Sequence, residues 1–108
     1  MRLSDIRTVI QQMATAFDML KGIGVIHTDV HLHNIMMENH QTRPFRVELI
    51  DFGVAISRSE ASQGALLQPL CFRSPKIMLG CPFSEAIDMW SLGCVTFIMI
   101  CGKLPFKV

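Results

Sequence analysis

Apolar residues near the start of the chain recur three or four positions apart: Ile6, Val9, Ile10, Met13, Ala16, Phe17 and Leu20. This spacing places them on one face of a helix, with mostly polar residues on the other face. We therefore predict an amphipathic helix from about Asp5 to Lys21. Ser4 or Asp5 is suited to cap its start, and Gly22 and Gly24 supply the permissive backbone that ends it.

The pattern changes after this helix. The stretch from His27 to Asn34 is short and crowded with hydrogen-bonding side chains, so we predict a loop rather than a core element. Ile35–Met37 and Val47–Ile50 are short apolar runs separated by turn-forming residues, which predicts a small β-hairpin. Residues 51–73 show no periodicity, and an irregular segment of this length is typical of a functional loop.

Regular spacing returns at Ser74. Ser74 followed by Pro75 is a favourable helix start, and Gly80 can end that helix after one or two turns. A longer helix is predicted from Ser84 to Gly102, apolar on nearly all sides, as in a helix at the centre of a larger body. Its most apolar part is too short for a membrane span, which needs about 20 residues.

Composition narrows the possible partners. The chain has 108 residues, enough for one domain, of which 50% are hydrophobic and 18% charged. This apolar excess suggests further protein around it, so we expect a protein partner to cover exposed apolar surface. A net charge of +1 without a basic cluster gives no reason to expect nucleic acid or membrane binding. The four cysteines form no C-x-x-C pair and no secretion signal is visible, which favours a reducing, intracellular setting.

Three polar residues carry the candidate chemistry. Asp29 and Asn34 lie in the polar loop with the spacing H-x-D-x-x-x-x-N, and Asp51 follows the hairpin in the triplet Asp51-Phe52-Gly53. Phosphoryl transfer from ATP needs a carboxylate that accepts the hydrogen bond of the substrate hydroxyl, and oxygen ligands for Mg²⁺. Asp29 suits the first role, and Asn34 and Asp51 the second. Gly53 allows a sharp turn after the metal ligand.

Over essentially its whole length the chain resembles the protein kinase superfamily, and within it the homeodomain-interacting protein kinases of the dual-specificity Tyr-regulated group. The strings that carry the resemblance are QQMATAF, GVIHTDVHLHNIMM, RPFRVELIDFG and PFSEAIDMWSLGCV. The resemblance implies a protein-kinase-like α+β fold, truncated: a mainly helical lower lobe with a small β-hairpin. Residues 1–108 would be a partial kinase domain without the upper ATP-binding lobe and the C-terminal helices.

The resemblance also implies an activity and further roles. It implies ATP- and Mg²⁺-dependent phosphorylation of Ser or Thr on protein substrates, with a preference for Pro after the target residue, and residence in the nucleus or cytoplasm. Asp88 would brace the backbone of the catalytic loop, and His27 and Phe52 would stack in a hydrophobic spine. Met36 would form part of the floor under adenine.

The chain departs from the family pattern at three places. His31 stands where a Lys contacts the transferred phosphate, and loss of such a charge often lowers rates by about 10²-fold or more. Lys76 stands where a Glu is usual, and Leu66 lies near the place of a regulatory Tyr, a residue type absent from the chain. No glycine-rich loop and no ATP-gripping Lys occur in these residues, so we expect the chain alone to be inactive.

Two alternatives stay open from the residues. A non-catalytic, pseudokinase-like remnant would bind partners through exposed apolar surface. A zinc hydrolase would use the alternating His27, Asp29, His31 and His33, although His40 is the only other histidine.

Overall fold

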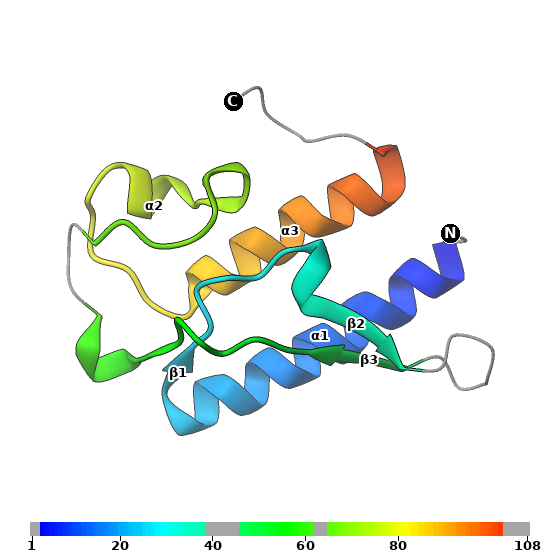
Figure 1. Cartoon of the computed structure of the whole chain (residues 1–108), viewed down its shortest axis with the longest axis horizontal. Helices are drawn as coiled ribbons and strands as arrows, with labels where there is room; N and C mark the ends of the chain where they lie inside the picture. The colour runs from blue at the N-terminus through cyan, green and yellow to red at the C-terminus, as the bar shows by residue number, and fades with distance from the viewer. Residues whose placement is uncertain (1–2, 39–45, 62–64, 103–108) are drawn as a thin grey trace.

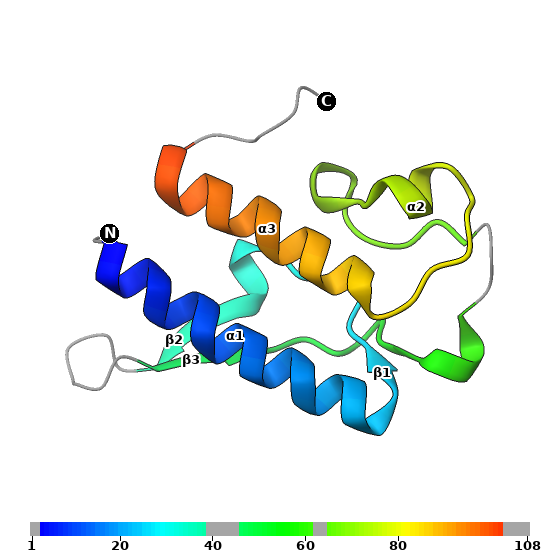
Figure 2. The ribbon, with the colours of Figure 1, turned by 180° about the vertical axis from the view of Figure 1, so that it is seen from behind.

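Two long helices form the framework of the molecule in the computed structural model, which describes residues 3–38, 46–61 and 65–102. Helix α1 spans Leu3–Ile23 and helix α3 spans Ala86–Cys101, and they pack against each other (Figures 1 and 2). Helix α1 was predicted from its periodicity, and α3 from Ser84 and the long apolar stretch that ends at Gly102. Helix α1 begins earlier than expected, so Ser4 and Asp5 lie inside it and do not cap it. Gly24, with φ of 73°, follows its end.

The first core lies between these helices and the hairpin. Buried residues from α1, from the loop of residues 27–34 and from α3 form one cluster: Val9, Met13, Phe17, Val30 and Leu92. Half-buried side chains of the hairpin and of α3 pack around it. The apolar face that the sequence predicted for α1 is therefore the face that is buried.

The predicted hairpin is present. Strand β2 (Ile35–Glu38) pairs antiparallel with strand β3 (Arg46–Leu49), and Ile35 lies opposite Leu49. The backbone N–H of Val47 donates to Oε1 of Gln12 at 2.7 Å, which ties the hairpin to α1. A second pairing, of β1 (Val25–Ile26) with β4 (Ile56–Ser57), was not predicted, because two-residue strands carry no detectable period.

The irregular segment of residues 51–74, named the activation segment after the resemblance to protein kinases, follows the hairpin and leads into α2 (Pro75–Met78). Ser74 caps α2 as expected. Within the described residues, three single-turn 3₁₀ helices interrupt the loops: η1 (Leu32–Asn34), η2 (Arg58–Glu60) and η3 (Leu70–Phe72). A second core joins β1, α2 and α3 through Ile26, Ile77 and Ile87. Gly102, with φ of 73°, caps the end of α3.

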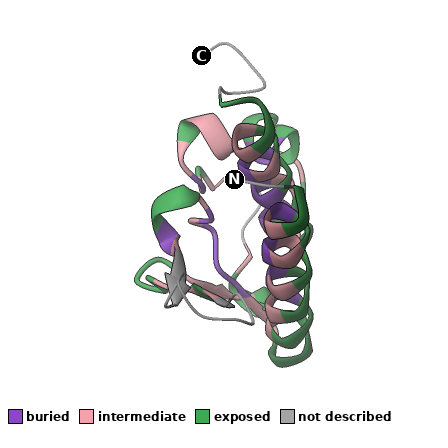
Figure 3. Ribbon diagram, turned by 90° about the vertical axis from the view of Figure 1, so that its right-hand side faces the viewer, coloured by how far each residue is buried: buried purple, intermediate pink, exposed green. Residues whose placement is uncertain are grey.

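Two expectations need correction. The polar loop is part of the interior: His27, Thr28 and Val30 are at most 1% exposed, and Figure 3 shows this buried segment beside the buried faces of the helices. Helix α3 is not covered on all sides, since Met89, Phe97 and Ile100 are exposed. In the described ranges no helix is long and apolar enough to cross a membrane. The mainly helical architecture with its small hairpin agrees with the predicted fold class.

Candidate active site

Asp88, in the first turn of α3, forms hydrogen bonds to the backbone of the catalytic loop, residues 27–34. One carboxylate oxygen of Asp88 accepts the N–H of His27 at 2.8 Å, and the other accepts the N–H of Thr28 at 2.9 Å. Asp88 is 2% exposed. Burial raises the pKa of its carboxyl group, although the two N–H groups act in the opposite direction. The bracing role expected for Asp88 therefore has a direct geometric basis.

His27 connects this loop with the segment after the hairpin. Its Nδ1 accepts the N–H of Asp29 at 3.1 Å, and its Nε2 lies 2.8 Å from the carbonyl oxygen of Ile50. Nδ1 must carry no proton because it accepts a hydrogen bond, and Nε2 must carry one because it faces a carbonyl oxygen. These partners therefore select the neutral tautomer of the imidazole that is protonated on Nε2. The ring also contacts Phe52 edge-to-face, with centroids 4.6 Å apart. His27 and Phe52 are therefore in direct contact, and their place in a hydrophobic spine stays a prediction.

Asp29 and Asn34 meet at the centre of the site. The amide nitrogen of Asn34 donates to the carbonyl oxygen of Asp29 at 2.8 Å and lies 3.1 Å from its Oδ2. These bonds hold the Asp29 side chain in one orientation and leave the amide oxygen of Asn34 for another partner. The amide of Asn34 is buried and therefore fixed in place, whereas the carboxylate of Asp29 is half-buried and remains accessible.

His31 stands beside both residues. Its Nε2 lies 3.5 Å from Oδ1 of Asp29 and 3.1 Å from the amide nitrogen of Asn34, while its Nδ1 accepts the N–H of His33 at 3.2 Å. The imidazole therefore occupies the neighbourhood where the family pattern places a lysine. His33 is exposed, as expected, and His31 is only half-buried.

Asp51 reaches the same site through the hairpin. The N–H of Ile50 donates to the carbonyl oxygen of Asn34 at 2.9 Å, which extends the β2–β3 pairing and brings Asp51 next to the loop. Asp51 is exposed, and its Oδ1 accepts the N–H of Gly53 at 3.3 Å. Gly53 is also where an added Cβ would lie 3.2 Å from that oxygen. The positive φ at this turn belongs to Asp51 (61°) and not to Gly53, so the special backbone conformation expected of Gly53 is not observed.

Backbone strain gathers around this site. In the part of the chain that the structure describes, three non-glycine residues have positive φ: Thr28 (70°), Asp51 (61°) and Gln68 (71°). This region is unfavourable for side chains with a Cβ, above all for a β-branched residue such as threonine. Hydrogen bonds fix Thr28, whose N–H is held by Asp88 and whose Oγ1 donates to the carbonyl of Val54 at 3.0 Å. Such strain is common at functional sites.

Gln68 anchors the activation segment. Its amide nitrogen donates to the carbonyl of Ile87 and to Oγ of Ser91, both at 2.7 Å, and its amide oxygen accepts the N–H of Ser74 at 2.9 Å. Ser91 in turn donates to the carbonyl of Phe72 at 2.8 Å. Sequence reasoning assigned no such role to Gln68, Ser91 or Thr28, because isolated polar residues give no signal of burial.

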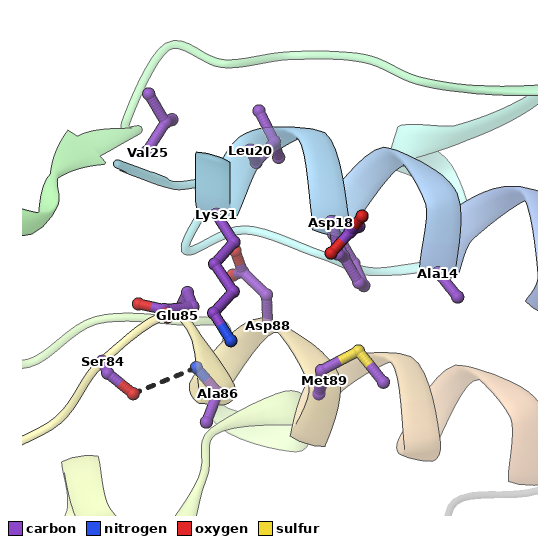
Figure 4. Close-up of a pocket in the computed structure, with 11 residues that line it drawn as sticks. Ala14, Asp18, Leu20, Lys21, Val25, Ser84, Glu85, Ala86, Asp88 and Met89 are labelled. Carbon is purple, nitrogen blue, oxygen red and sulfur yellow. Dashed lines mark hydrogen bonds between the residues drawn. The ribbon is translucent and has the colours of Figure 1, made fainter. Parts of the chain in front are cut away.

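A cavity of about 410 Å³ lies behind the catalytic loop, between the end of α1 and the start of α3 (Figure 4). Asp88 contributes to its wall, and Lys21 extends between the two helices. None of Asp29, Asn34 and Asp51 lines it. It is therefore separate from the candidate site for phosphoryl transfer.

The donor atoms suit a magnesium ion better than a zinc ion. The oxygens of Asn34 and Asp51 are the hard ligands that Mg²⁺ accepts, with phosphates and water completing its shell. In the described part of the chain, no three His, Cys, Asp or Glu residues are placed to hold a metal among themselves. The zinc hydrolase interpretation thus gains no support. The side chain of Met36 lies outside the described residues, so its place under adenine stays a prediction.

Comparison with known proteins identifies the class. The protein kinase domain family matches residues 1–108, and the chain belongs to this family. It is 47% identical over 100 residues to homeodomain-interacting protein kinase 1 of Caenorhabditis elegans, which covers 93% of this chain and 12% of that protein. It is 49% identical to homeodomain-interacting protein kinase 2 of Mus musculus over 93% of this chain and 8% of the relative. For homeodomain-interacting protein kinase 4 of Homo sapiens the identity is 46%, over 83% of this chain and 15% of the relative. The chain thus spans about a tenth of the length of the curated relatives it matches.

Proposed function

We propose that the chain carries the catalytic centre of a protein serine/threonine kinase, which transfers the γ-phosphoryl group of ATP to hydroxyl groups of protein substrates. The observation that carries this proposal is the junction of Asp29, Asn34 and Asp51. The Asn34 amide bonds to Asp29 at 2.8 and 3.1 Å, and the Ile50 N–H bonds to the Asn34 carbonyl at 2.9 Å. One small region thus combines a half-buried carboxylate with two oxygen ligands.

Each residue has a defined task in this proposal. Asp29 accepts the hydrogen bond of the substrate hydroxyl and orients it, because its carboxylate is fixed by Asn34. The amide oxygen of Asn34 and the carboxylate of Asp51 would hold Mg²⁺ against the phosphates. A bound Mg²⁺ would neutralise negative charge on the phosphate oxygens. Asp88 acts through the backbone of the loop and touches no reactant, so it is a positioning residue.

The resemblance implies a preference for proline after the target residue, although the segment from Gln68 to Cys71 departs from the family pattern; one contact of this segment is compatible with the preference. The carbonyl oxygen of Gln68 is turned toward Arg73, which donates to it from Nε at 3.2 Å and from a terminal nitrogen at 2.9 Å. In this proposal the substrate N–H after the target residue faces this carbonyl, which already accepts two hydrogen bonds from Arg73. Proline has no N–H to satisfy and loses nothing. The resemblance to proline-directed relatives implies the same preference.

His31 lowers the expected rate. An imidazole beside Asp29 does not provide the permanent positive charge that a lysine would offer to the transferred phosphate. We expect His31→Lys to raise the rate of phosphoryl transfer by about 10- to 100-fold in an assembled kinase. We also propose that these 108 residues do not turn over until other residues supply a glycine-rich loop and an ATP-gripping lysine. An intracellular location, in the nucleus or cytoplasm, goes with this function.

A chimera tests the proposal. The matching segment of a homeodomain-interacting protein kinase is replaced by this chain, and transfer of labelled phosphate from Mg²⁺-ATP to Ser-Pro and Ser-Ala peptides is measured. We expect transfer that favours the Ser-Pro peptide and that Asp29→Asn abolishes. A chimera that is folded by circular dichroism, binds ATP and yet transfers no phosphate, with or without His31→Lys, contradicts the proposal.

That outcome would favour the second candidate, a non-catalytic module that binds a protein partner. The exposed apolar residues of α3 support this candidate, since Met89 is 50% and Ile100 56% exposed. The departures at His31 and Lys76 fit it as well. It predicts an inactive chimera whose structure and stability are otherwise those of the parent kinase.

A further inference from the structure

The turn of residues 51–53 is bonded at both of its ends to two consecutive side chains of the catalytic loop. Nε2 of His27 lies 2.8 Å from the carbonyl oxygen of Ile50, directly before the turn. Oγ1 of Thr28 donates to the carbonyl oxygen of Val54, directly after the turn, at 3.0 Å. The loop thus holds the turn from both sides, and the hydroxyl of Thr28 supplies the bond at the far end.

Thr28 adopts an unusual backbone conformation for its residue type. Its φ is 70°, a region that is unfavourable for a β-branched side chain. The residue is 1% exposed, so water does not compete for its hydroxyl, and its N–H donates to Asp88 at 2.9 Å. A strained residue persists where the surrounding contacts hold it, and such residues cluster at functional sites. The bond to Val54 is one of the two contacts that hold Thr28 in this conformation.

Asp51 needs this support because the hydrogen bond of its own side chain is local. The carboxylate is exposed and accepts the N–H of Gly53, two residues further along the chain. Its φ of 61° also lies in the left-handed region, which the turn has to maintain. The turn is closed by the N–H of Ala55, which donates to the carbonyl oxygen of Phe52 at 3.0 Å. Movement of Val54 would therefore move the carboxylate of Asp51.

From these contacts we propose that Thr28 is a positioning residue of the metal site. Its hydroxyl keeps the turn of residues 51–53 in the orientation that presents the carboxylate of Asp51 together with the amide oxygen of Asn34. The inference rests on the proposed function, since it concerns the two residues that would hold Mg²⁺. Thr28 itself touches no reactant, and it acts through the backbone of Val54.

Four variants separate the hydroxyl of Thr28 from its shape. Thr28→Val keeps the branched shape and the strain at φ of 70°, and leaves the carbonyl of Val54 without its donor. Thr28→Ala also lacks the hydroxyl but relieves strain, so it serves if Thr28→Val does not fold. Thr28→Ser keeps the hydroxyl and should keep the bond. Thr96→Val is the matched control, because the half-buried hydroxyl of Thr96 donates to the carbonyl of Leu92 inside α3 at 2.9 Å.

Amide hydrogen exchange of the 108-residue chain measures this support without any kinase activity. The reporter is the N–H of Ala55, which closes the turn, and the reference is the N–H of Val47, which donates to Gln12. We expect exchange at Ala55 to become about tenfold faster in Thr28→Val and to stay unchanged in Thr28→Ser and Thr96→Val. A general loss of stability would raise both rates together, so the ratio of the Ala55 rate to the Val47 rate reports on the turn alone.

Phosphoryl transfer by the chimera gives the second readout. We expect Thr28→Val to raise the Mg²⁺ concentration for half-maximal transfer by about tenfold with an unchanged KM for the peptide, and Thr28→Ser to keep the parent value. A merely structural role would reduce the amount of active protein and leave this concentration unchanged.

Either of two results overturns the proposal: equal exchange ratios in the parent chain and Thr28→Val, or an active chimera in which Thr28→Val needs no more Mg²⁺ than the parent. A parent chimera that transfers no phosphate contradicts the proposed function instead, and the exchange ratio then still decides whether Thr28 holds the turn.

Discussion

Replacing Asp88 with alanine removes the acceptor of two backbone N–H groups in the interior. The donors belong to His27 and Thr28, which are 0% and 1% exposed, so water cannot replace the lost oxygens without opening the loop. Each buried group left without a partner costs about 1–3 kcal/mol. We therefore expect the free energy of unfolding to fall by about 3–5 kcal/mol, a large part of the roughly 5–15 kcal/mol available to a domain of this size.

Urea unfolding followed by Trp90 fluorescence measures this loss. Asp88→Asn keeps one oxygen acceptor and should lose about 1–3 kcal/mol, which leaves a variant that can be measured if the alanine variant does not fold. Asp18→Ala removes an exposed carboxylate of α1 and should change stability by less than about 0.5 kcal/mol. A loss below about 1 kcal/mol in Asp88→Ala, or a loss no larger than in Asp18→Ala, would refute the role assigned to these bonds.

The same residue gives a prediction about pH. Burial raises the pKa of Asp88 in the folded chain, so the native state holds its proton more tightly than the unfolded state. The stabilising contribution of this group is complete below the unfolded pKa of about 3.9 and is lost as the pH rises through the folded pKa. The stability difference between the parent chain and Asp88→Asn should therefore shrink as the pH rises through that window.

Three further predictions concern other parts of the fold. Gln68→Ala should lower the free energy of unfolding by about 2–3 kcal/mol, because the N–H of Ser74 and the carbonyl of Ile87 lose their partner; equal urea midpoints for variant and parent would contradict this. Gly102→Ala should destabilise by about 1 kcal/mol through backbone strain at φ of 73°, whereas Gly93→Ala, inside α3 with open space around its Cβ, should stabilise by about 0.5–1 kcal/mol; the same sign for both in thermal unfolding would contradict the argument. Burial, with a smaller effect of Cys71, raises the pKa of the Cys94 thiol, so iodoacetamide at pH 8 should modify exposed Cys101 first and Cys94 last, as peptide mass spectrometry would reveal.

The sequence predicted those parts of the fold in which apolar residues follow a recognisable pattern along the chain. The apolar positions of α1 repeat often enough to mark the buried face. Two short apolar runs with turn-forming residues between them were sufficient to predict the hairpin. Strands β1 and β4 have two residues each, too few for any pattern, and they form because Asp88 and the second core fix the chain on either side. Their pairing could not be deduced locally.

The sequence predicted which residue types form the candidate site. It did not predict which polar residues around the site are buried. Spacing alone marked Asp29, Asn34 and Asp51, but the interior position of Thr28 depends on a bond to Asp88, a residue 60 positions away. Gln68 is a similar case, since its partners Ile87 and Ser91 belong to another element. Polar residues become buried through distant partners, which a single sequence does not display.

The most direct test of the central claim is calorimetry of Mg²⁺-ATP binding to the 108-residue chain, with Asp51→Asn as the variant and Glu48→Gln, an exposed carboxylate of β3, as the matched control. The account predicts binding that requires Mg²⁺, is weakened about tenfold or more in Asp51→Asn, and is unchanged in Glu48→Gln. Binding that persists without Mg²⁺, or that is equally tight in Asp51→Asn, would contradict the assignment of Asn34 and Asp51 as the metal-holding pair.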